Sequence, residues 1–213
     1  MSAEPVPPAD VPDPSADADA LNAQSIAFMR RVRDGDERAF RDLVELHQHA
    51  VIGTCARMLG DVEEAHDLAQ TVFLRVWKAA PRYEPSARFT TWLYTIVRNL
   101  VFNESRRRSR RPLVSLDAPL PGGDDENSPA RDVPDPQARP ADAAAAQAEL
   151  EAAIDRAIAA LPEQQRLAVT LRKYEDMPYE EIAAVLKTSV PSVKSLLFRA
   201  RTHLRESLRA YLE

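Results

Sequence analysis

The chain has 213 residues, of which 45% are hydrophobic, so it is long enough for one ordinary domain or two small ones. No apolar run is long enough to cross a bilayer, and no basic start precedes an apolar stretch, so we expect neither direct membrane insertion nor a secretory signal. The one cysteine, Cys55, excludes an internal disulfide and favours a reducing cytoplasm.

Charge and proline are unevenly distributed. Residues 1–24 and 112–142 each carry a net charge of −5 and hold most of the 17 prolines, whereas residues 25–111 carry +5 and residues 143–213 are balanced. Acidic, proline-rich stretches bury too little apolar surface to offset the entropy of chain ordering. We therefore predict a disordered acidic tail over residues 1–24, a flexible linker over residues 112–142, and folded segments over residues 25–111 and 143–213.

Hydrophobic spacing in the first folded segment is helical. Asp61 is placed to cap a helix, and Glu64 completes a capping-box-like start. After a loop marked by Pro81 and Pro85, apolar residues recur at i, i+3, i+4, i+7, i+8 and i+11 from Phe89 onward. This pattern predicts an amphipathic helix, and no stretch alternates with period two for long enough to predict a strand.

The second folded segment is also helical by pattern. An alanine-rich helix is predicted from about residue 143 to Leu161, and Pro162 suits the first turn of the next helix. Shorter helices follow over residues 179–186 and from Pro191 onward. The predicted fold class is all-α, with two small helical domains joined by a flexible acidic, proline-rich linker, the C-terminal one a helix-turn-helix.

The last two predicted helices have the division of faces that a DNA-reading motif needs. Ile182 and Leu186 would pack against Val193 and Ala200, and Ser189 would cap the second helix. An amphipathic helical hairpin with a solvated basic face is the alternative. The outward face of the second helix offers Ser192, Lys194, Ser195, Phe198, Arg199 and Arg201.

Arginines are concentrated at the end of the first segment. Residues 98–111 contain six arginines and one acid, close to Tyr94, Thr95, Asn99 and Asn103. Because arginines neutralise phosphates and aromatic rings stack on unpaired bases, we interpret this stretch as a nucleic-acid surface. A helix end with cations favoured by the macrodipole, or a solvated start of the linker, is the alternative.

No catalytic set is present in the sequence. His47 and His49 are two residues apart and so lie on different sides of a helix, and together with His66 and His203 they make no metal-binding spacing. Cys55 is interpreted as a small core residue. We predict no enzymatic activity, no metal, no cofactor and no small-molecule substrate.

Several short motifs occur in order along the chain. The first segment contains Gly35-Asp36-x-x-Ala39-Phe40, Leu59-Gly-Asp-Val-Glu-Glu-Ala65, Asp67-Leu-Ala-Gln-Thr-Val-Phe-Leu-Arg-Val-Trp77 and Phe89-Thr-Thr-Trp-Leu-Tyr-Thr-Ile-Val-Arg-Asn99. The second contains Leu161-Pro-Glu-Gln-Gln-Arg166, Leu171-Arg, Tyr179-Glu-Glu-Ile-Ala183, Val193-Lys-Ser195 and Arg199-Ala-Arg201. Together they resemble regions 2 and 4 of the bacterial RNA polymerase sigma factors of the extracytoplasmic-function (ECF) group.

The resemblance implies that the chain binds core RNA polymerase, directs it to promoter DNA and helps to melt the minus-ten element. The contacts with the β′ clamp helices would be Asp67, Leu68, Gln70, Thr71, Phe73 and Leu74, with Phe73 partly in the core. The minus-ten element, with one base extruded into a pocket, would be held by Arg82, Tyr83, Arg88, Thr91, Tyr94, Thr95, Arg98, Asn99, Asn103, Arg106 and Arg107. The minus-thirty-five element would be read in the major groove by Ser189, Ser192, Lys194, Ser195, Phe198, Arg199 and Arg201.

The resemblance also implies a second polymerase contact, on the β flap, and an anti-sigma factor that wedges between the two domains. Lys187, Pro191 and Leu196 stand where members of the group often have glycine, glycine and arginine, so the promoter contacts differ there. Two other functions are alternatives. One is a sigma-factor mimic that sequesters an inhibitor, but a mimic would not need the arginine cluster. The other is an ordinary helix-turn-helix regulator, but that function leaves the first segment unexplained.

Overall fold

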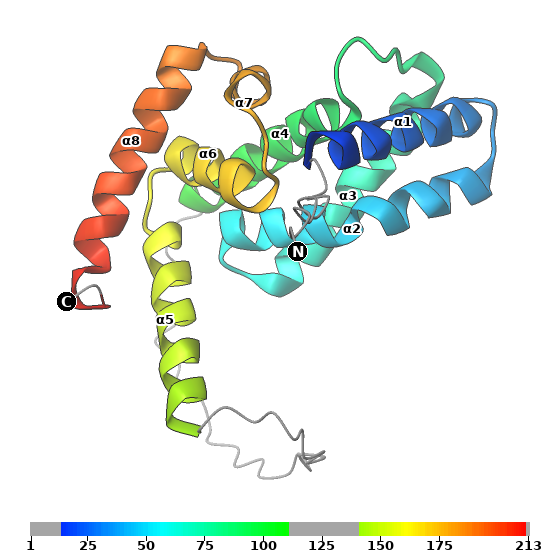
Figure 1. Cartoon of the computed structure of the whole chain (residues 1–213). Helices are drawn as coiled ribbons and strands as arrows, with labels where there is room; N and C mark the ends of the chain where they lie inside the picture. Colours follow the sequence, from blue (N-terminus) through cyan, green and yellow to red (C-terminus); the bar gives the residue numbers. More distant parts are fainter. Residues whose placement is uncertain (1–13, 111–140, 212–213) are drawn as a thin grey trace, which may run out of the picture.

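The computed structural model describes residues 14–110 and 141–211, and this part of the chain contains helices, turns and loops but no strand (Figure 1). The all-α prediction is therefore confirmed. The elements are α1 (Pro14–Arg33), α2 (Glu37–Leu59), α3 (Val62–Ala79), the 3-10 helix η1 (Ala80–Arg82), α4 (Phe89–Arg110), α5 (Ala141–Ala159), α6 (Glu163–Tyr174), α7 (Tyr179–Leu186), α8 (Val190–Ser207) and the 3-10 helix η2 (Arg209–Tyr211).

Local side-chain chemistry sets the boundaries of the first helices. Asp36 caps α2 by accepting hydrogen bonds from the backbone N–H groups of Arg38 and Ala39, at 2.9 and 3.1 Å. Gly60 ends α2 in a left-handed conformation, with φ of +71°, which glycine adopts without steric cost. Asp61 then accepts from the Glu64 N–H at 3.0 Å, which confirms its predicted role as the cap of α3.

Residues 14–24 differ from the sequence prediction, because they form the first half of α1 and not a disordered tail. Their acidic charge and prolines suggested disorder, but the stretch is also rich in alanine, a strong helix former, and Asp17 in the first turn suits the helix dipole. The second half of α1 is anchored by Met29, which is fully buried. Residues 1–13 and 111–140, including nearly all of the predicted linker, lie outside the described residues.

The helices of the first segment share one apolar core. Leu43 of α2, Val72 of α3 and the α4 residues Phe89 and Leu93 are at most 1% exposed, and Cys55 is completely buried among them. Burial raises the pKa of the Cys55 thiol to about 12, so this thiol stays protonated and inert. The interpretation of Cys55 as a core residue is confirmed.

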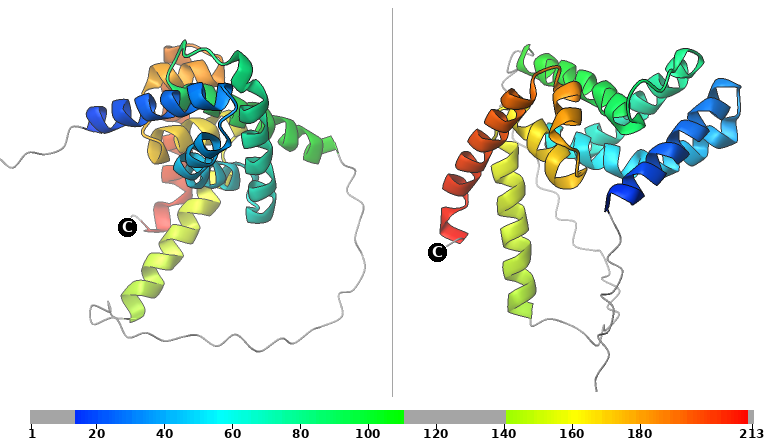
Figure 2. Two further views of the ribbon diagram at one scale, coloured as in Figure 1. Left: turned by 90° about the vertical axis from the view of Figure 1, so that its right-hand side faces the viewer. Right: turned by 45° about the horizontal axis from the view of Figure 1, so that its top comes forward.

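The second segment packs directly against the first (Figure 2). Helix α7 lies on α4 and α6 lies on α2, and the buried residues of the two segments form one continuous cluster that includes Leu167, Leu171 and Ile182. The sequence predicted two domains on a tether and gave no sign of this contact. An inhibitor that inserted between the two segments would first have to separate them.

Helices α7 and α8 form the predicted helix-turn-helix. Val193 and Ala200 are completely buried, as predicted, and Ser189 caps α8 by accepting from the Ser192 N–H. Lys187, in the turn, has a φ of +55°, the left-handed conformation that glycine would adopt at lower cost.

The buried pair of Ser25 and His47 gives a pH prediction. The Ser25 hydroxyl donates to the Leu21 carbonyl at 2.7 Å, so its oxygen can accept from His47 Nε2–H, 2.8 Å away. Burial lowers the pKa of His47 to about 4, below the value of the unfolded chain. The unfolded state therefore takes up a proton first, and stability is complete above pH 6.5 and is lost as the pH falls toward 4.

We expect the free energy of unfolding to fall by about 2 kcal/mol between pH 7.5 and pH 5 because of this group alone. His47→Gln, which can still donate to Ser25 but does not titrate, should lose that part of the pH dependence. Urea denaturation of both proteins at the two pH values measures the difference. An unchanged pH dependence in the variant would show that other groups are responsible.

Candidate nucleic-acid and partner interfaces

Helix α3 presents a mixed polar and apolar face to solvent. Asp67, Gln70 and Thr71 are exposed, and Leu74, at 51% exposure, is one of the most exposed large apolar side chains. Phe73 is only 7% exposed, so its place in the core agrees with the sequence prediction, and Leu68 is partly buried.

A groove of about 440 Å³ adjoins this face of α3 and is lined by residues of α2 and α3, including Phe40, Val44, Ile52, Phe73 and Leu74. An exposed leucine beside an apolar groove with a polar rim is the surface that an amphipathic partner helix needs. Of the predicted core-polymerase contacts, Gln70, Phe73 and Leu74 line this groove, whereas Asp67, Leu68 and Thr71 lie on α3 outside its lining.

Aromatic rings surround the loop between α3 and α4. The ring of Tyr83 lies 4.9 Å from that of Trp92 and 6.2 Å from that of Phe89, and Phe89 and Trp92 are 5.7 Å apart. Tyr83 and Trp92, together with Lys78 and Arg82, line a depression of about 720 Å³. Aromatic walls with cations at the rim suit an unstacked base and its phosphate.

The first turns of α4 are covered by the second segment. Thr91 Oγ1 donates to Glu181 of α7 at 2.7 Å, and the Arg88 guanidinium lies 3.3 Å from the same carboxylate and also pairs with Asp19 of α1. Tyr94 is 2% exposed, and its hydroxyl lies beside Glu175. Arg88, Thr91 and Tyr94, which the sequence predicted to hold the minus-ten element, are thus in contact with other parts of this chain: Arg88 and Thr91 with Glu181 of α7, and Tyr94 with Glu175 at the C-terminal end of α6.

The outer side of α4 continues the predicted surface. Arg98 donates to Asn99 at 3.1 Å and lies over the ring of Phe102, which holds its guanidinium along the helix. Thr95, one turn earlier, is half-buried and donates to the Thr91 carbonyl. Asn103, Arg106 and Arg107 follow and are exposed.

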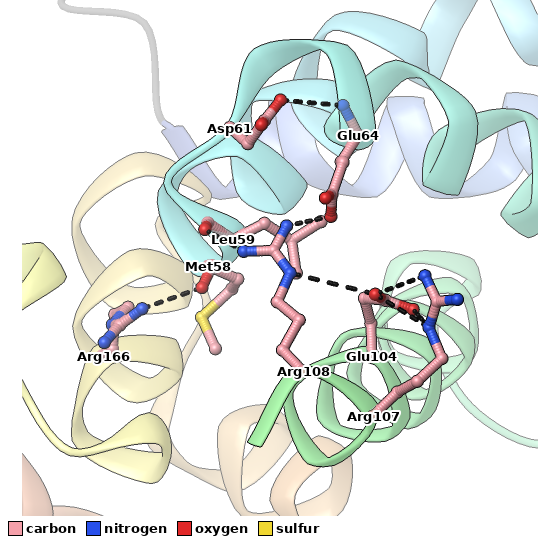
Figure 3. Close-up of polar contacts among 8 residues, drawn as sticks. All are labelled: Met58, Leu59, Asp61, Glu64, Glu104, Arg107, Arg108 and Arg166. Carbon is pink, nitrogen blue, oxygen red and sulfur yellow. Dashed lines mark hydrogen bonds and ion pairs between the residues drawn. The ribbon is translucent and has the colours of Figure 1, made fainter. Parts of the chain in front are cut away.

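The arginine cluster that follows has two different roles (Figure 3). Arg107 is exposed and forms a two-point ion pair with Glu104 on its own helix, at 2.8 Å. Arg108 instead reaches across to the turn between α2 and α3, where it donates to the Leu59 carbonyl at 2.8 Å and pairs with Glu64. Arg108 therefore neutralises the C-terminal end of α2 and belongs to the fold, a role that sequence reasoning did not separate from DNA binding.

Helix α8 presents its predicted DNA-reading side chains on one face. Phe198 is 71% exposed, and Lys194, Arg199 and Arg201 are exposed around it. The Arg199 guanidinium donates to Ser195 Oγ at 2.9 Å, which directs it along the helix, and Ser189 and Ser192 lie together at the N-terminal end. The seven residues predicted to read the minus-thirty-five element thus belong to one helix: Ser189 is its N-cap, and the other six lie along its outward side.

Sequence reasoning missed a groove that adjoins the predicted DNA-reading face of α8 and shares Arg201 with it. Its volume is about 740 Å³, and it lies between α5, α6 and α8, with Ile154, Ile158, Leu197, Leu204 and Leu208 among its lining residues. The leucine spacing of i, i+7 and i+11 on α8 was a possible signal. The position of α5, which forms the opposite wall, required the structure.

The comparisons with known proteins agree with this geometry. Residues 43–111 match the family model of sigma-70 region 2, and residues 151–204 match that of sigma-70 region 4. The chain is 35% identical to the RNA polymerase sigma-H factor of Pseudomonas aeruginosa over 193 residues, which cover 89% of this chain and 96% of that protein. It is 33% identical to the ECF RNA polymerase sigma factor SigW of Bacillus subtilis over 181 residues, covering 85% and 95% of the two chains.

Among solved structures, CnrH in complex with the cytosolic domain of CnrY matches with a TM-score of 0.62 and 26% identity, covering 88% of this chain and 98% of that one. The chain therefore belongs to the ECF sigma factors of bacterial RNA polymerase. As a member of this non-enzymatic family, it binds core RNA polymerase and directs it to specific promoters. No helix in the described part of the chain is long and apolar enough to span a membrane.

The contact between Glu181 and the start of α4 is testable. Reversing its charge with Glu181→Arg places a like charge beside Arg88, which costs on the order of 2 kcal/mol and should separate the two segments. Small-angle X-ray scattering should report a larger radius of gyration. Glu180→Arg, on the exposed side of the same helix, is the matched control and should leave the radius unchanged. Equal radii for all three proteins would show that this contact does not hold the segments together.

Proposed function

We propose that three surfaces of this sigma factor divide the work of initiation: α3 binds the polymerase β′ clamp helices, the loop before α4 and α4 itself hold the melted minus-ten element, and α8 reads the minus-thirty-five element. The observation that carries this division is the order of region 2 and region 4 matches over the two helical segments. The protein would act in the cytoplasm, where RNA polymerase transcribes.

The polymerase surface consists of Asp67, Gln70, Thr71 and Leu74 around the α2–α3 groove, supported from beneath by Leu68 and Phe73. The exposure of Leu74 supports this proposal, because an apolar side chain of that size is stabilised by burial in a partner. Clamp helices would place an apolar stripe in the groove and polar groups against Asp67 and Gln70.

The minus-ten surface starts at the aromatic depression and runs along α4. Arg82, Tyr83 and Trp92 would receive the extruded base, and Arg98, Asn99, Asn103, Arg106 and Arg107 would hold the strand and its phosphates. Arg88, Thr91 and Tyr94 would join this surface once the second segment has moved away from α4. The exposed arginines favour this role over that of a sigma-factor mimic, which needs no phosphate contacts.

In the second segment, Lys194, Ser195, Phe198, Arg199 and Arg201 would enter the major groove from one face of α8. Ser189 and Ser192 would contact the backbone at its N-terminal end. The groove between α5, α6 and α8 would accept an apolar segment of the β flap, because isoleucines and leucines of α5 and α8 line it. Its charged lining residues are Arg172, Lys173, Asp176, Arg201 and Arg205. CnrH is known in complex with a cytosolic protein domain, and we propose an inhibitory protein, an anti-sigma factor, as a partner of this chain as well.

Two experiments test the proposed division. The first is a pulldown of core RNA polymerase with the purified chain. The second is run-off transcription from a promoter that the holoenzyme selects from random DNA. Asp67→Arg combined with Gln70→Ala should reduce polymerase binding at least tenfold, because it places a cation on the exposed face of α3 and removes a polar group from the groove. Arg199→Ala with Lys194→Ala should leave polymerase binding intact and abolish the minus-thirty-five preference. Asp42→Asn, at an exposed position of α2 that does not line the groove, is the control for the first variant.

Absence of polymerase binding would favour the mimic or an independent regulator, and promoter binding without polymerase would single out the regulator. Normal polymerase binding by the double α3 variant would place the contact elsewhere on the chain.

The closed arrangement gives a further expected result for the isolated chain. Because Glu181 and Glu175 cover part of α4, and because the distance between the segments is not fixed by polymerase, the free protein should bind duplex promoter DNA only weakly. Fluorescence anisotropy with the selected promoter should give a dissociation constant at least a hundredfold weaker than that of the holoenzyme. Nanomolar specific binding by the isolated chain would contradict this expectation.

A further inference from the structure

Helix α4 begins without a capping side chain of its own. The residue before its first position is Arg88, whose side chain has no hydrogen-bond acceptor, so the first backbone N–H groups of α4 need a partner from elsewhere. Asn22 of α1, which is 67 residues away in the sequence, provides it: its Oδ1 accepts a hydrogen bond from the Phe89 N–H at 2.8 Å. The start of α4 is therefore capped by another helix.

The turn of α1 that carries Asn22 is fixed on two sides. One turn before it, Asp19 pairs with Arg88, so two residues on one face of α1 hold two successive residues of the chain entering α4. One turn after it, Ser25 is completely buried and hydrogen-bonded to His47, whose ring lies 5.0 Å from that of Phe89. The buried contacts of the neighbouring turns thus hold Asn22 in place beside the start of α4.

The capped residue supports the aromatic depression. The ring of Phe89 is completely buried and contacts the rings of Tyr83 and Trp92, which form the wall proposed for the extruded base. Loss of the cap would let the first turn of α4 fray, and the residues of that turn are Phe89 to Trp92. A shift of that turn alters the shape of the depression, because Trp92 lines it, whereas Asn22 is not among the residues that line the α3 groove.

We propose that Asn22 is a positioning residue for minus-ten recognition, and that the acidic first half of α1 takes part in promoter opening through it. This inference rests on the proposed function of α4 and the preceding loop. Asn22 touches no DNA in this proposal; it fixes the geometry of the residues that do.

The test uses the full chain assembled with core polymerase on the promoter selected above. Asn22→Ala removes the acceptor and should reduce promoter opening, measured as permanganate reactivity of minus-ten thymines at saturating DNA, by about three- to tenfold. Asn22→Asp keeps an oxygen at the same position and should restore opening to within about twofold of the original chain. Gln24→Ala, on the exposed side of the same helix, is the matched control and should have no effect.

Affinity for core polymerase, measured in parallel, should be the same for all four proteins. Asn22→Gln keeps the amide and favours the helix but moves the acceptor by one methylene. It should therefore impair opening as the alanine variant does, and it replaces that variant if alanine prevents folding.

Normal opening by Asn22→Ala or Asn22→Gln, or failure of Asn22→Asp to restore it in a folded protein, would overturn the proposal. Absence of opening by the unchanged chain would instead refute the proposed role of α4 itself, so the two failures are distinguishable.

Discussion

The rest of the structure depends on the two-sided burial of α4. One side of this helix, with Leu93, Val97 and Val101 at no more than 1% exposure, completes the core of the first segment, and its first turns also contact α7. A helix that is fixed by its own core can present the remaining side chains in a defined geometry without ordering them again when DNA arrives. The amphipathic spacing that makes α4 a core helix therefore also supports its proposed role as a DNA-binding surface.

The C-terminal end of α2 shows how charge is distributed between folding and binding (Figure 3). Its last carbonyl groups face two cations from distant helices: Arg108 of α4 donates to Leu59, and Arg166 of α6 donates to Met58 at 2.8 Å. Both guanidiniums satisfy carbonyls that the helix leaves without partners and lie at the negative end of its dipole. The two cations with carbonyl partners stabilise the fold, whereas exposed arginines of the same end of α4, such as Arg106 and Arg107, belong to the surface that we propose for DNA.

Periodicity and capping chemistry predicted the helices well because they are local: Asp61, Ser189 and the stripe from Phe89 all appear in the structure as the sequence indicated. What sequence reasoning missed was nonlocal. Asn22 fell within a stretch assigned to a disordered tail, since acidic composition outweighed its alanine content, and no spacing rule connects it to Phe89. The role of Arg108 and the contact of Glu181 with Thr91 are likewise set by helices that meet only in three dimensions.

The contact between the two segments combines an apolar cluster with polar bonds that water can replace. Thr91 bonds to Glu181, Thr54 donates to Glu175 at 3.2 Å, and burial raises the pKa of the Glu175 carboxyl, which shows that the charged form is poorly solvated there. Each such bond contributes only about 0.5–1.5 kcal/mol net, because separation returns both partners to water, and a buried carboxylate regains its hydration. A partner that binds only the separated form can supply an energy of this size through its own contacts. The polarity of the contact thus lets the segments separate without leaving buried polar groups unpaired, as the proposed exposure of α4 on polymerase requires.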